Sequence, residues 1–165
     1  NNCQQIEEVV TEVKGRMPEI LAHIEAGTIG IFASKFAKKV YGIEIVKQAI
    51  EDAHGNAKLN NVNNIEFICG DVEQAFDKLI KKEKVEPSVV IVDPPRKGLD
   101  NNTIENIMKL NVERVVYISC NPATMVRDLK MMEEKYEIKE VQPVDMFPFT
   151  SHVESVAVMV IKDNL

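Results

Sequence analysis

Ser88-Val89-Val90-Ile91-Val92-Asp93 is a run dominated by β-branched residues that ends on an acid. Such a run is typical of a strand buried on both faces, because parallel sheets carry helices above and below. Pro94-Pro95 then ends the strand, since proline cannot donate to a sheet. A second apolar run, Val115–Ser119, follows about twenty residues later. The two runs predict the centre of a parallel sheet.

Outward from these runs, strands alternate with segments whose apolar residues recur at helical spacing. This order predicts an α/β fold: a Rossmann-like, mostly parallel twisted sheet with helices on both faces. The tail pair of strands has no helix between its members and should form an antiparallel hairpin. The strands are expected at 40–45, 65–69, 88–93, 115–119, 136–145 and 153–161, and the helices at 31–37, 46–60, 72–84, 103–110 and 122–135.

Residues 1–26 are expected to form an N-terminal helical segment ahead of an α/β domain that spans 27–165. Apolar residues recur at i, i+3, i+4 and i+7 between Gln4 and Lys14, which is one face of a helix. Pro18 can open a second short helix over 19–25, because proline suits the first helical position.

Composition bounds the function. The 165 residues are 45% hydrophobic and 28% charged, with 20 basic and 26 acidic side chains and a net charge of −6, so one globular domain without uniform attraction to phosphates is expected. Three cysteines without a short-spaced Cys/His cluster argue against a disulfide scaffold and a bound metal, and they fit a cytoplasmic protein. No run of 18 apolar residues occurs, so no membrane span is expected.

Ligands of such sheets bind beyond the carboxyl ends of the strands, where this chain places its unusual residues. Gly27-Thr28-Ile29-Gly30 is a glycine turn before a helix, which lets backbone approach a ligand. Glu44 ends the next strand, 44 − 27 = 17 residues later, and could bind ribose hydroxyls. A tight turn with an ordinary acid is an equal alternative. Asp71 could accept from an adenine amine, although an N-cap is the favoured role; both can hold.

Asp93-Pro94-Pro95-Arg96-Lys97-Gly98 predicts a stiff loop at a strand tip, because each proline fixes its backbone. Arg96 and Lys97 give a local positive charge that suits a phosphate. The alternative is a rigid turn with solvated charges.

Cys120 closes a buried strand just before Pro122, where a helix should start. The positive end of a helix favours a thiolate there, so we interpret Cys120 as a candidate nucleophile rather than core packing. Cys69 precedes Gly70-Asp71, whose negative charge opposes a thiolate, and is expected to fill the core.

The loop between the two tail strands carries His152 and Glu154, and either could accept a proton. A structural hydrogen bond is the favoured role of His152. Glu154 heads an apolar strand and is either solvent-facing or functional.

Three segments together resemble the S-adenosylmethionine-dependent RNA (uracil-5-)-methyltransferases. They are residues 93–98, residues 119–124 with Arg127-Asp128, and residues 145–148 with His152-Val153-Glu154. The resemblance implies a class I methyltransferase sheet with Cys120 as nucleophile, Glu154 as general base, and cofactor contacts from Gly27, Thr28, Glu44, Asp71 and Asp93. It further implies substrate contacts from Asp93 and Arg96, an RNA substrate (tRNA or rRNA), and an RNA-binding N-terminal part.

The implied chemistry explains the residue types. C5 of uracil is a weak nucleophile, and addition of a thiolate to C6 makes C5 reactive enough to take the methyl group. A base then removes the C5 proton and the thiolate leaves. One departure stands out: Leu21–Ala26 lacks the apolar run expected of the family's first strand. This strand is therefore predicted to be absent, or its residues to be missing from the sequence ahead of Gly27.

Two other functions remain open from the sequence. An acid followed by Pro-Pro also resembles amino-group (N6-adenine-type) methyltransferases, which need no cysteine, although Arg96 stands where those enzymes usually have an aromatic residue. A non-catalytic cofactor-binding or RNA-binding domain would fit the unusual glycine segment, but not the retention of both Cys120 and Glu154.

Overall fold

The computed structural model describes residues 17–23, 27–146, 149–150 and 152–163. The described chain forms one seven-stranded sheet with strand order β3-β2-β1-β4-β5-β7-β6. The first five strands run parallel, and β7 pairs antiparallel with both β5 and β6. The strands are β1 (Met17–His23), β2 (Ala37–Glu44), β3 (Ile65–Cys69), β4 (Val89–Val92), β5 (Arg114–Ser119), β6 (Tyr136–Val144) and β7 (Glu154–Ile161).

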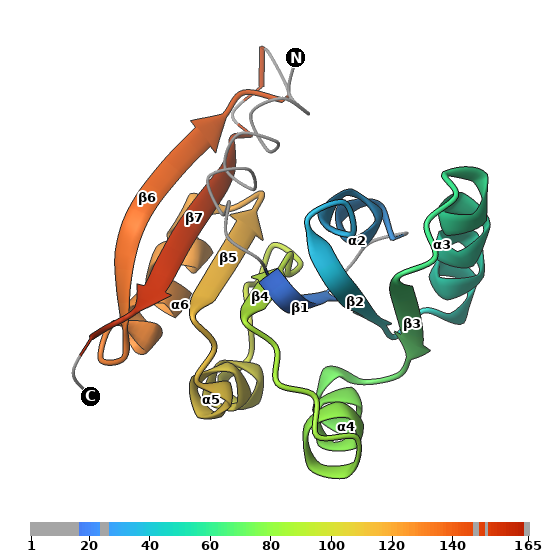
Figure 1. Cartoon of the computed structure of the whole chain (residues 1–165). Helices are drawn as coiled ribbons and strands as arrows, with labels where there is room; N and C mark the ends of the chain where they lie inside the picture. Colours follow the sequence, from blue (N-terminus) through green and yellow to red (C-terminus); the bar gives the residue numbers. More distant parts are fainter. Residues whose placement is uncertain (1–16, 24–26, 147–148, 151, 164–165) are drawn as a thin grey trace.

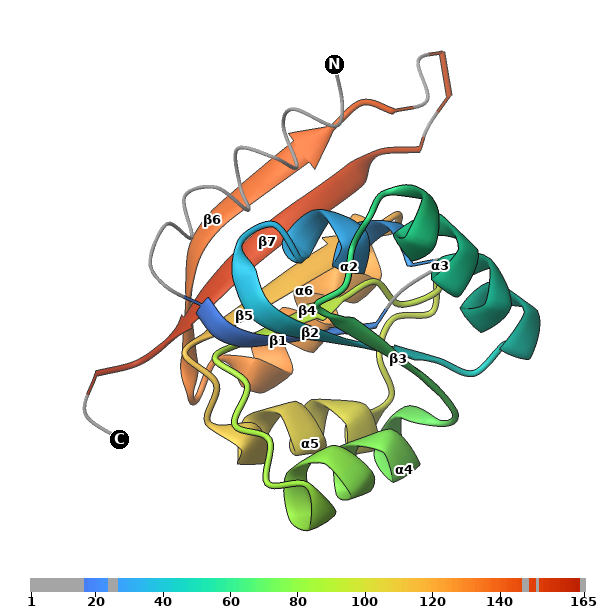
Figure 2. The ribbon, with the colours of Figure 1, turned by 45° about the vertical axis from the view of Figure 1, so that its right-hand side comes forward.

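Helices cover both faces of this sheet (Figures 1 and 2), as its parallel order requires. Figure 2 shows α2 on one face and α4 and α5 on the other, while the β6–β7 hairpin forms one end of the sheet. The helices are α2 (Thr28–Ala33), α3 (Lys47–Leu59), α4 (Val72–Phe76) with its wider continuation η1 (Asp77–Lys82), α5 (Asn101–Leu110) and α6 (Pro122–Met132). The predicted α/β fold and the antiparallel tail hairpin are therefore confirmed.

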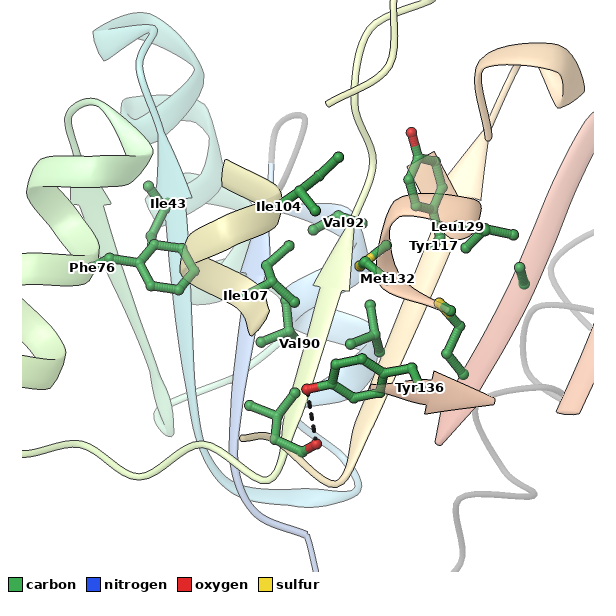
Figure 3. Packing of buried hydrophobic residues seen from close by; sticks show 14 of the residues in the cluster. Ile43, Phe76, Val90, Val92, Ile104, Ile107, Tyr117, Leu129, Met132 and Tyr136 are labelled. Carbon is green, nitrogen blue, oxygen red and sulfur yellow. Dashed lines mark hydrogen bonds between the residues drawn. The ribbon is translucent and has the colours of Figure 1, made fainter. Parts of the chain in front are cut away.

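The larger part of the core lies between the sheet and helices α4, α5 and α6. Figure 3 shows Phe76, Ile104 and Ile107 packed with residues of the strands, among them Val90 and Val92. Every residue of β4 is buried, which explains its unbroken apolar sequence.

Tyr136 closes the far end of this core. Burial raises the pKa of Tyr136 to about 12. Its hydroxyl therefore stays protonated and donates to the Val112 carbonyl over 3.2 Å (Figure 3). The buried oxygen is thus satisfied at the end where α5 gives way to β5.

The N-terminal prediction is wrong where the structure can test it. Residues 19–23 of the expected helix over 19–25 belong to strand β1 instead. β1 lies at the centre of the sheet, with Ile20 opposite both Val40 of β2 and Val89 of β4. The first strand is therefore present and the sheet begins ahead of Gly27. The predicted helix between Gln4 and Lys14 lies outside the described residues.

Candidate active site

The carboxyl ends of the parallel strands share one edge of the sheet, and the sequence-predicted residues lie along it. Thr28 opens α2, Glu44 ends β2, and Asp71 follows β3. Asp93 follows β4 and Cys120 follows β5. The fold thus gathers residues that are distant in the chain, and they divide into a β1–β3 side and a β4–β7 side.

Gly27 precedes α2 in a left-handed backbone conformation, with φ of +78°. A Cβ at this position would lie 2.7 Å from the Cβ of Ala53 in α3, so only glycine fits between the two helices. Thr28 next to it is exposed. The glycine is thus required by the packing of α2 against α3, and the predicted approach of a ligand to this turn stays a prediction.

Glu44 and Asp71 both bond to backbone two residues further along the chain. The Glu44 carboxylate accepts from the Val46 amide over 2.8 Å. The Asp71 carboxylate accepts from the Glu73 amide over 2.8 Å at the start of α4, which confirms the favoured N-cap role. Glu44 is half-buried and Asp71 exposed, so solvent or a ligand can reach both carboxylates.

An apolar cavity lies beside the β4 loop, between α4 and α5. Its lining includes Ile43, Val72, Phe76, Pro94 and Pro95. The two prolines contribute apolar surface and have no N–H group, so this wall offers a ligand apolar contact rather than backbone hydrogen-bond donors. An apolar space of this kind suits an aromatic ring.

The loop after β4 is fastened to the start of α6. Gly98 donates its amide to the Pro95 carbonyl over 2.8 Å, which closes a tight turn. The Arg96 carbonyl accepts from the Asn121 side-chain amide over 3.0 Å and from the Thr124 hydroxyl over 3.2 Å. The stiff loop expected from the prolines is thus held across the chain, with the Arg96 and Lys97 side chains exposed.

Cys120 lies half-buried between β5 and α6 as a free thiol. The Asn121 side chain caps α6 by accepting from the Ala123 amide over 3.2 Å, and Pro122 takes the first helical position as predicted. Ser119 is buried, and its hydroxyl bonds to both the amide and the carbonyl of Asn121. The thiol therefore stands on a turn that is fixed from both sides.

The antiparallel strand β7 brings Glu154 to the same edge. Ser119 of β5 pairs with Ser155 of β7, so Cys120 directly follows the last paired residue of β5 and Glu154 directly precedes that of β7. Glu154 is half-buried and pairs with Val144 of β6. The topology thus brings the two residues to the same end of the β5–β7 pair, although 34 positions separate them.

His152 links the tail loop to the β4 loop. Its Nδ1 lies 2.9 Å from an Nη atom of Arg96, so the ring nitrogen accepts from the guanidinium. The favoured structural role of His152 is confirmed by this bond. Phe147, Pro148 and Ser151 of the same loop lie outside the described residues.

One cysteine prediction is wrong. Cys69 was expected to fill the core, but its side chain is exposed, with Sγ 3.9 Å from the Ile45 carbonyl. The reason is position: β3 is an edge strand of the sheet and lacks a neighbour on one side. A strand-end cysteine is buried only where helices and strands cover it.

From the sequence, Asp128 has no predicted role beyond its place in a segment that resembles the family. In the structure it is fully buried, and it accepts hydrogen bonds from Leu99 and Tyr117. A signal was available: Met125, Asp128, Leu129 and Met132 have the spacing of one helix face, and an acid within an apolar face needs partners.

Two features of the described part of the chain bear on function, namely the length of its helices and the grouping of its metal-binding side chains. None of its helices combines the length and the apolar run that a bilayer crossing requires. Among the same residues, no three His, Cys, Asp or Glu side chains gather in a way that could hold a metal ion.

A model of the tRNA (uracil-5-)-methyltransferases matches residues 2–162 of the chain. The chain belongs to this family. Family membership confirms the resemblance carried by the three sequence segments, and it accounts for the sheet that ends in an antiparallel hairpin.

Relatives within and around the family support the same assignment. An "uncharacterized RNA methyltransferase" of Enterococcus faecalis is 45% identical over 165 residues, covering 96% of this chain and 36% of that protein. One of Caldanaerobacter subterraneus subsp. tengcongensis is 55% identical over 134 residues, or 81% of this chain and 29% of that protein. The chain thus spans about a third of the length of these relatives.

A solved structure extends the comparison to the fold. The Pyrococcus abyssi tRNA (uracil-54, C5)-methyltransferase, crystallised with S-adenosyl-L-homocysteine, superposes with a TM-score of 0.77 at 35% identity. The match covers 95% of this chain and 37% of that one. The fold is therefore that of the class I S-adenosylmethionine-dependent methyltransferases.

Proposed function

We propose that this chain is the catalytic part of an RNA methyltransferase that uses S-adenosylmethionine to methylate C5 of a uridine in tRNA or rRNA. The observation that carries the proposal is the β5–β7 register, which ends at Ser119 and Ser155 and so brings the adjoining Cys120 and Glu154 to the same end of the strand pair. A nucleophile and a base in that arrangement match the needs of methylation at C5.

The β1–β3 side has the groups to hold S-adenosylmethionine. Glu44 would bind the ribose hydroxyls, and the backbone around Gly27 and Thr28 would approach the amino-acid end. The adenine ring would lie at the apolar cavity beside Pro94, with Asp71 accepting from its amine. When bound, the cofactor supplies a methyl group on a positively charged sulfur.

The β4–β7 side would carry the chemistry. The Cys120 thiolate would add to C6 of the uracil, and the C5=C6 electron pair would form the new bond from C5 to the methyl carbon. The methyl–sulfur bond would break at the same time, with its electron pair left on the sulfur of S-adenosylhomocysteine. The Glu154 carboxylate then takes the proton from C5, and the electrons of that C–H bond restore the double bond as the thiolate leaves. Asp93 would hydrogen-bond the polar edge of the base, and Arg96 with Lys97 would contact a phosphate.

RNA binding needs more than this region. The net charge of −6 opposes a polyanion, and the basic groups beside the site are few. We therefore propose that an N-terminal domain of the longer protein supplies most RNA affinity and that the target uridine leaves its stack to reach Cys120. A cytoplasmic place of action is part of the same proposal.

RNA that carries 5-fluorouridine tests the proposal. Fluorine at C5 cannot leave as a proton does, so the wild type should form a covalent complex with RNA that survives denaturation. Cys120→Ser should form none and should lose methyl transfer by on the order of 10³-fold or more, while still binding S-adenosylmethionine. Glu154→Gln should accumulate the covalent complex on unmodified RNA, because the C5 proton stays.

The same experiment decides against the competing functions. An amino-group methyltransferase would methylate adenine and keep its activity in Cys120→Ser, which contradicts the proposal. A non-catalytic domain would bind cofactor but neither transfer methyl groups nor trap RNA. The non-catalytic alternative is less favoured by the structure than by the sequence, because the first strand, which was not evident from the sequence pattern, is present as β1.

A further inference from the structure

Asp128 is a fully buried carboxylate in α6, on the side of the helix that packs into the core. Its Oδ2 accepts from the Leu99 amide over 2.8 Å and from the Tyr117 hydroxyl over 2.6 Å, while Oδ1 accepts from Arg127 Nε over 2.8 Å. Burying a charged group is costly unless it is paired and hydrogen-bonded, and here both conditions hold. These hydrogen bonds to the carboxylate hold the Leu99 backbone and the Tyr117 and Arg127 side chains in place.

Arg127 grips the same loop from outside the core. One of its Nη atoms donates to the Lys97 carbonyl over 2.9 Å and to the Leu99 carbonyl over 3.3 Å. The ion pair therefore holds the loop by backbone groups on both sides of Gly98. Such contacts depend on loop conformation and are independent of the side chains the loop carries.

Gly98 is what allows the loop to lie so close. Its φ is +81°, and a Cβ there would lie 2.5 Å from Asp128 Oδ2 and 2.6 Å from the Arg127 guanidinium. Any other residue would push against the ion pair. Loop conformation and ion pair are thus fitted to each other.

Tyr117 connects this network to β5. Burial, strengthened by the neighbouring Asp128 carboxylate, raises the pKa of Tyr117, so its hydroxyl remains a donor. Three residues further on is Cys120, and next to it Asn121 bonds the Arg96 carbonyl over 3.0 Å. The β4 loop and the Cys120 turn are consequently joined at two places, on either side of the loop.

We propose that Arg127 and Asp128 are positioning residues that hold the 93–99 loop against α6 and so fix Asp93 and Arg96 relative to Cys120. This inference rests on the proposed function for its catalytic consequence. Misplacement of a reacting group by about 1 Å can cost about 10²-fold in rate, so loosening the loop should lower kcat. Cofactor affinity should change less than kcat, because Glu44 and Asp71 lie on the other side of the site, although Pro94 and Pro95 of the loop line the cavity proposed for adenine.

A pair of tyrosines gives a matched test. Tyr117 and Tyr136 both lie in the same buried cluster and both donate one hydrogen bond, but Tyr136 bonds to the Val112 backbone, away from the loop. Tyr117→Phe and Tyr136→Phe should lower the melting temperature alike. Only Tyr117→Phe, together with Asp128→Asn and Arg127→Lys, should lower kcat, with about 10–100-fold expected for Asp128→Asn.

A second readout is independent of methyl transfer. Iodoacetamide alkylation of Cys120, followed by peptide mass spectrometry, should become several-fold faster in Asp128→Asn and Tyr117→Phe, because the turn that carries the half-buried thiol is held less firmly to the loop. The exposed Cys69 in the same chain is the internal reference, and Tyr136→Phe should match the wild type.

The outcomes separate the two proposals. Should Tyr117→Phe and Asp128→Asn be folded and match Tyr136→Phe in both kcat and Cys120 alkylation, the network is merely structural and the inference is overturned. Should the wild type trap no 5-fluorouridine RNA, the proposed function fails, while the alkylation rates still decide whether the network positions Cys120.

Discussion

The two sides of the site are held by different kinds of hydrogen bond. On the β1–β3 side, the carboxylates of Glu44 and Asp71 bond to amides two residues away in the chain. On the β4–β7 side, the bonds from Asn121 and Arg127 to the loop, and from the loop to Asp128, join residues 25 to 30 positions apart. The carboxylates of the two acids are thus held locally and the loop beside Cys120 across the chain, while the Glu44 backbone is also tied to the end of β3, since its carbonyl accepts from the Gly70 amide over 2.9 Å.

The difference matches what each side has to do in the proposed reaction. A cosubstrate enters and leaves in every turnover, so its acids need only be displayed, and local bonds suffice. A nucleophile and the groups that orient its target must keep their mutual geometry within a fraction of an ångström. Bonds between distant segments provide that, since they tie separate loops into one unit.

The largest effect is expected for Gly27→Ala. The new Cβ would meet Ala53 of α3 at 2.7 Å, where no flexible side chain can yield, and the left-handed backbone adds its own strain. A loss of about 2–4 kcal/mol in the free energy of unfolding is expected. Urea titration measures it, and a loss below about 0.5 kcal/mol would mean that the turn relaxes freely.

Gly98→Ala should lower the free energy of unfolding less than Gly27→Ala does, but it should lower the rate of methyl transfer more. Its Cβ would meet the ends of Arg127 and Asp128, and the exposed arginine can move away. About 1–3 kcal/mol of stability should be lost. If the two sides differ as described, methyl transfer per folded molecule falls more than S-adenosylmethionine affinity, to which the same loop contributes through Pro94 and Pro95. Equal losses in both would break the distinction.

Glu44→Ala should leave stability nearly unchanged and weaken S-adenosylmethionine binding about tenfold, or about 1.4 kcal/mol. The local bond to Val46 is exposed, and its loss is made good by water. Calorimetric titration gives the affinity, with Glu51→Ala on the outer surface of α3 as control. Unchanged affinity in Glu44→Ala would remove Glu44 from the cofactor site.

The smallest effect is expected for Asp100→Asn, which changes a local helix cap on the β4–β7 side. Asp100 caps α5 by accepting from the Thr103 amide over 2.9 Å, and this bond holds the pKa of Asp100 below its usual value. Since the folded pKa is the lower one, the charged cap stabilises the fold above the unfolded pKa and loses its effect as the pH falls through the folded value. Asparagine caps nearly as well, so the difference at pH 7 should stay below about 0.5 kcal/mol.

Unfolding of the two proteins at pH 7 and pH 3 checks the sign. The wild type should lose stability relative to Asp100→Asn as the pH falls, because only the aspartate is protonated. A wild type that gains on the variant in acid would contradict the lowered pKa.

Most of the fold followed from local patterns. The unbroken apolar run of β4, the proline at the start of α6 and the helix-free tail each have a local physical cause, and each prediction held. β1 did not follow, because its sequence carries Glu19 and His23, and its partners lie 20 to about 70 residues away. A strand that non-local pairing stabilises leaves little trace in its own sequence.

The candidate site was predictable to the same extent. The cap role of Asp71 arises within a few residues, and the sequence displays it. The apolar face that includes Asp128 is also visible in the helical spacing, whereas the exposure of Cys69 depends on which elements cover it, and only the assembled sheet settles that. The roles assigned to Cys120, Glu154, Asp93 and Arg96 remain predictions for the experiments above.

The place of β7 has a consequence for how the site comes into being during translation. β7 is the last of the described strands to be synthesised, yet it inserts between β5 and β6 rather than adding to the edge. Domains fold largely as their chain emerges, from the N-terminus onward. A nascent chain that already carries β1–β3 and the Cys120 turn therefore lacks Glu154 and the strand that holds it. The ribosome releases an assembled site only after β7 has left the exit tunnel.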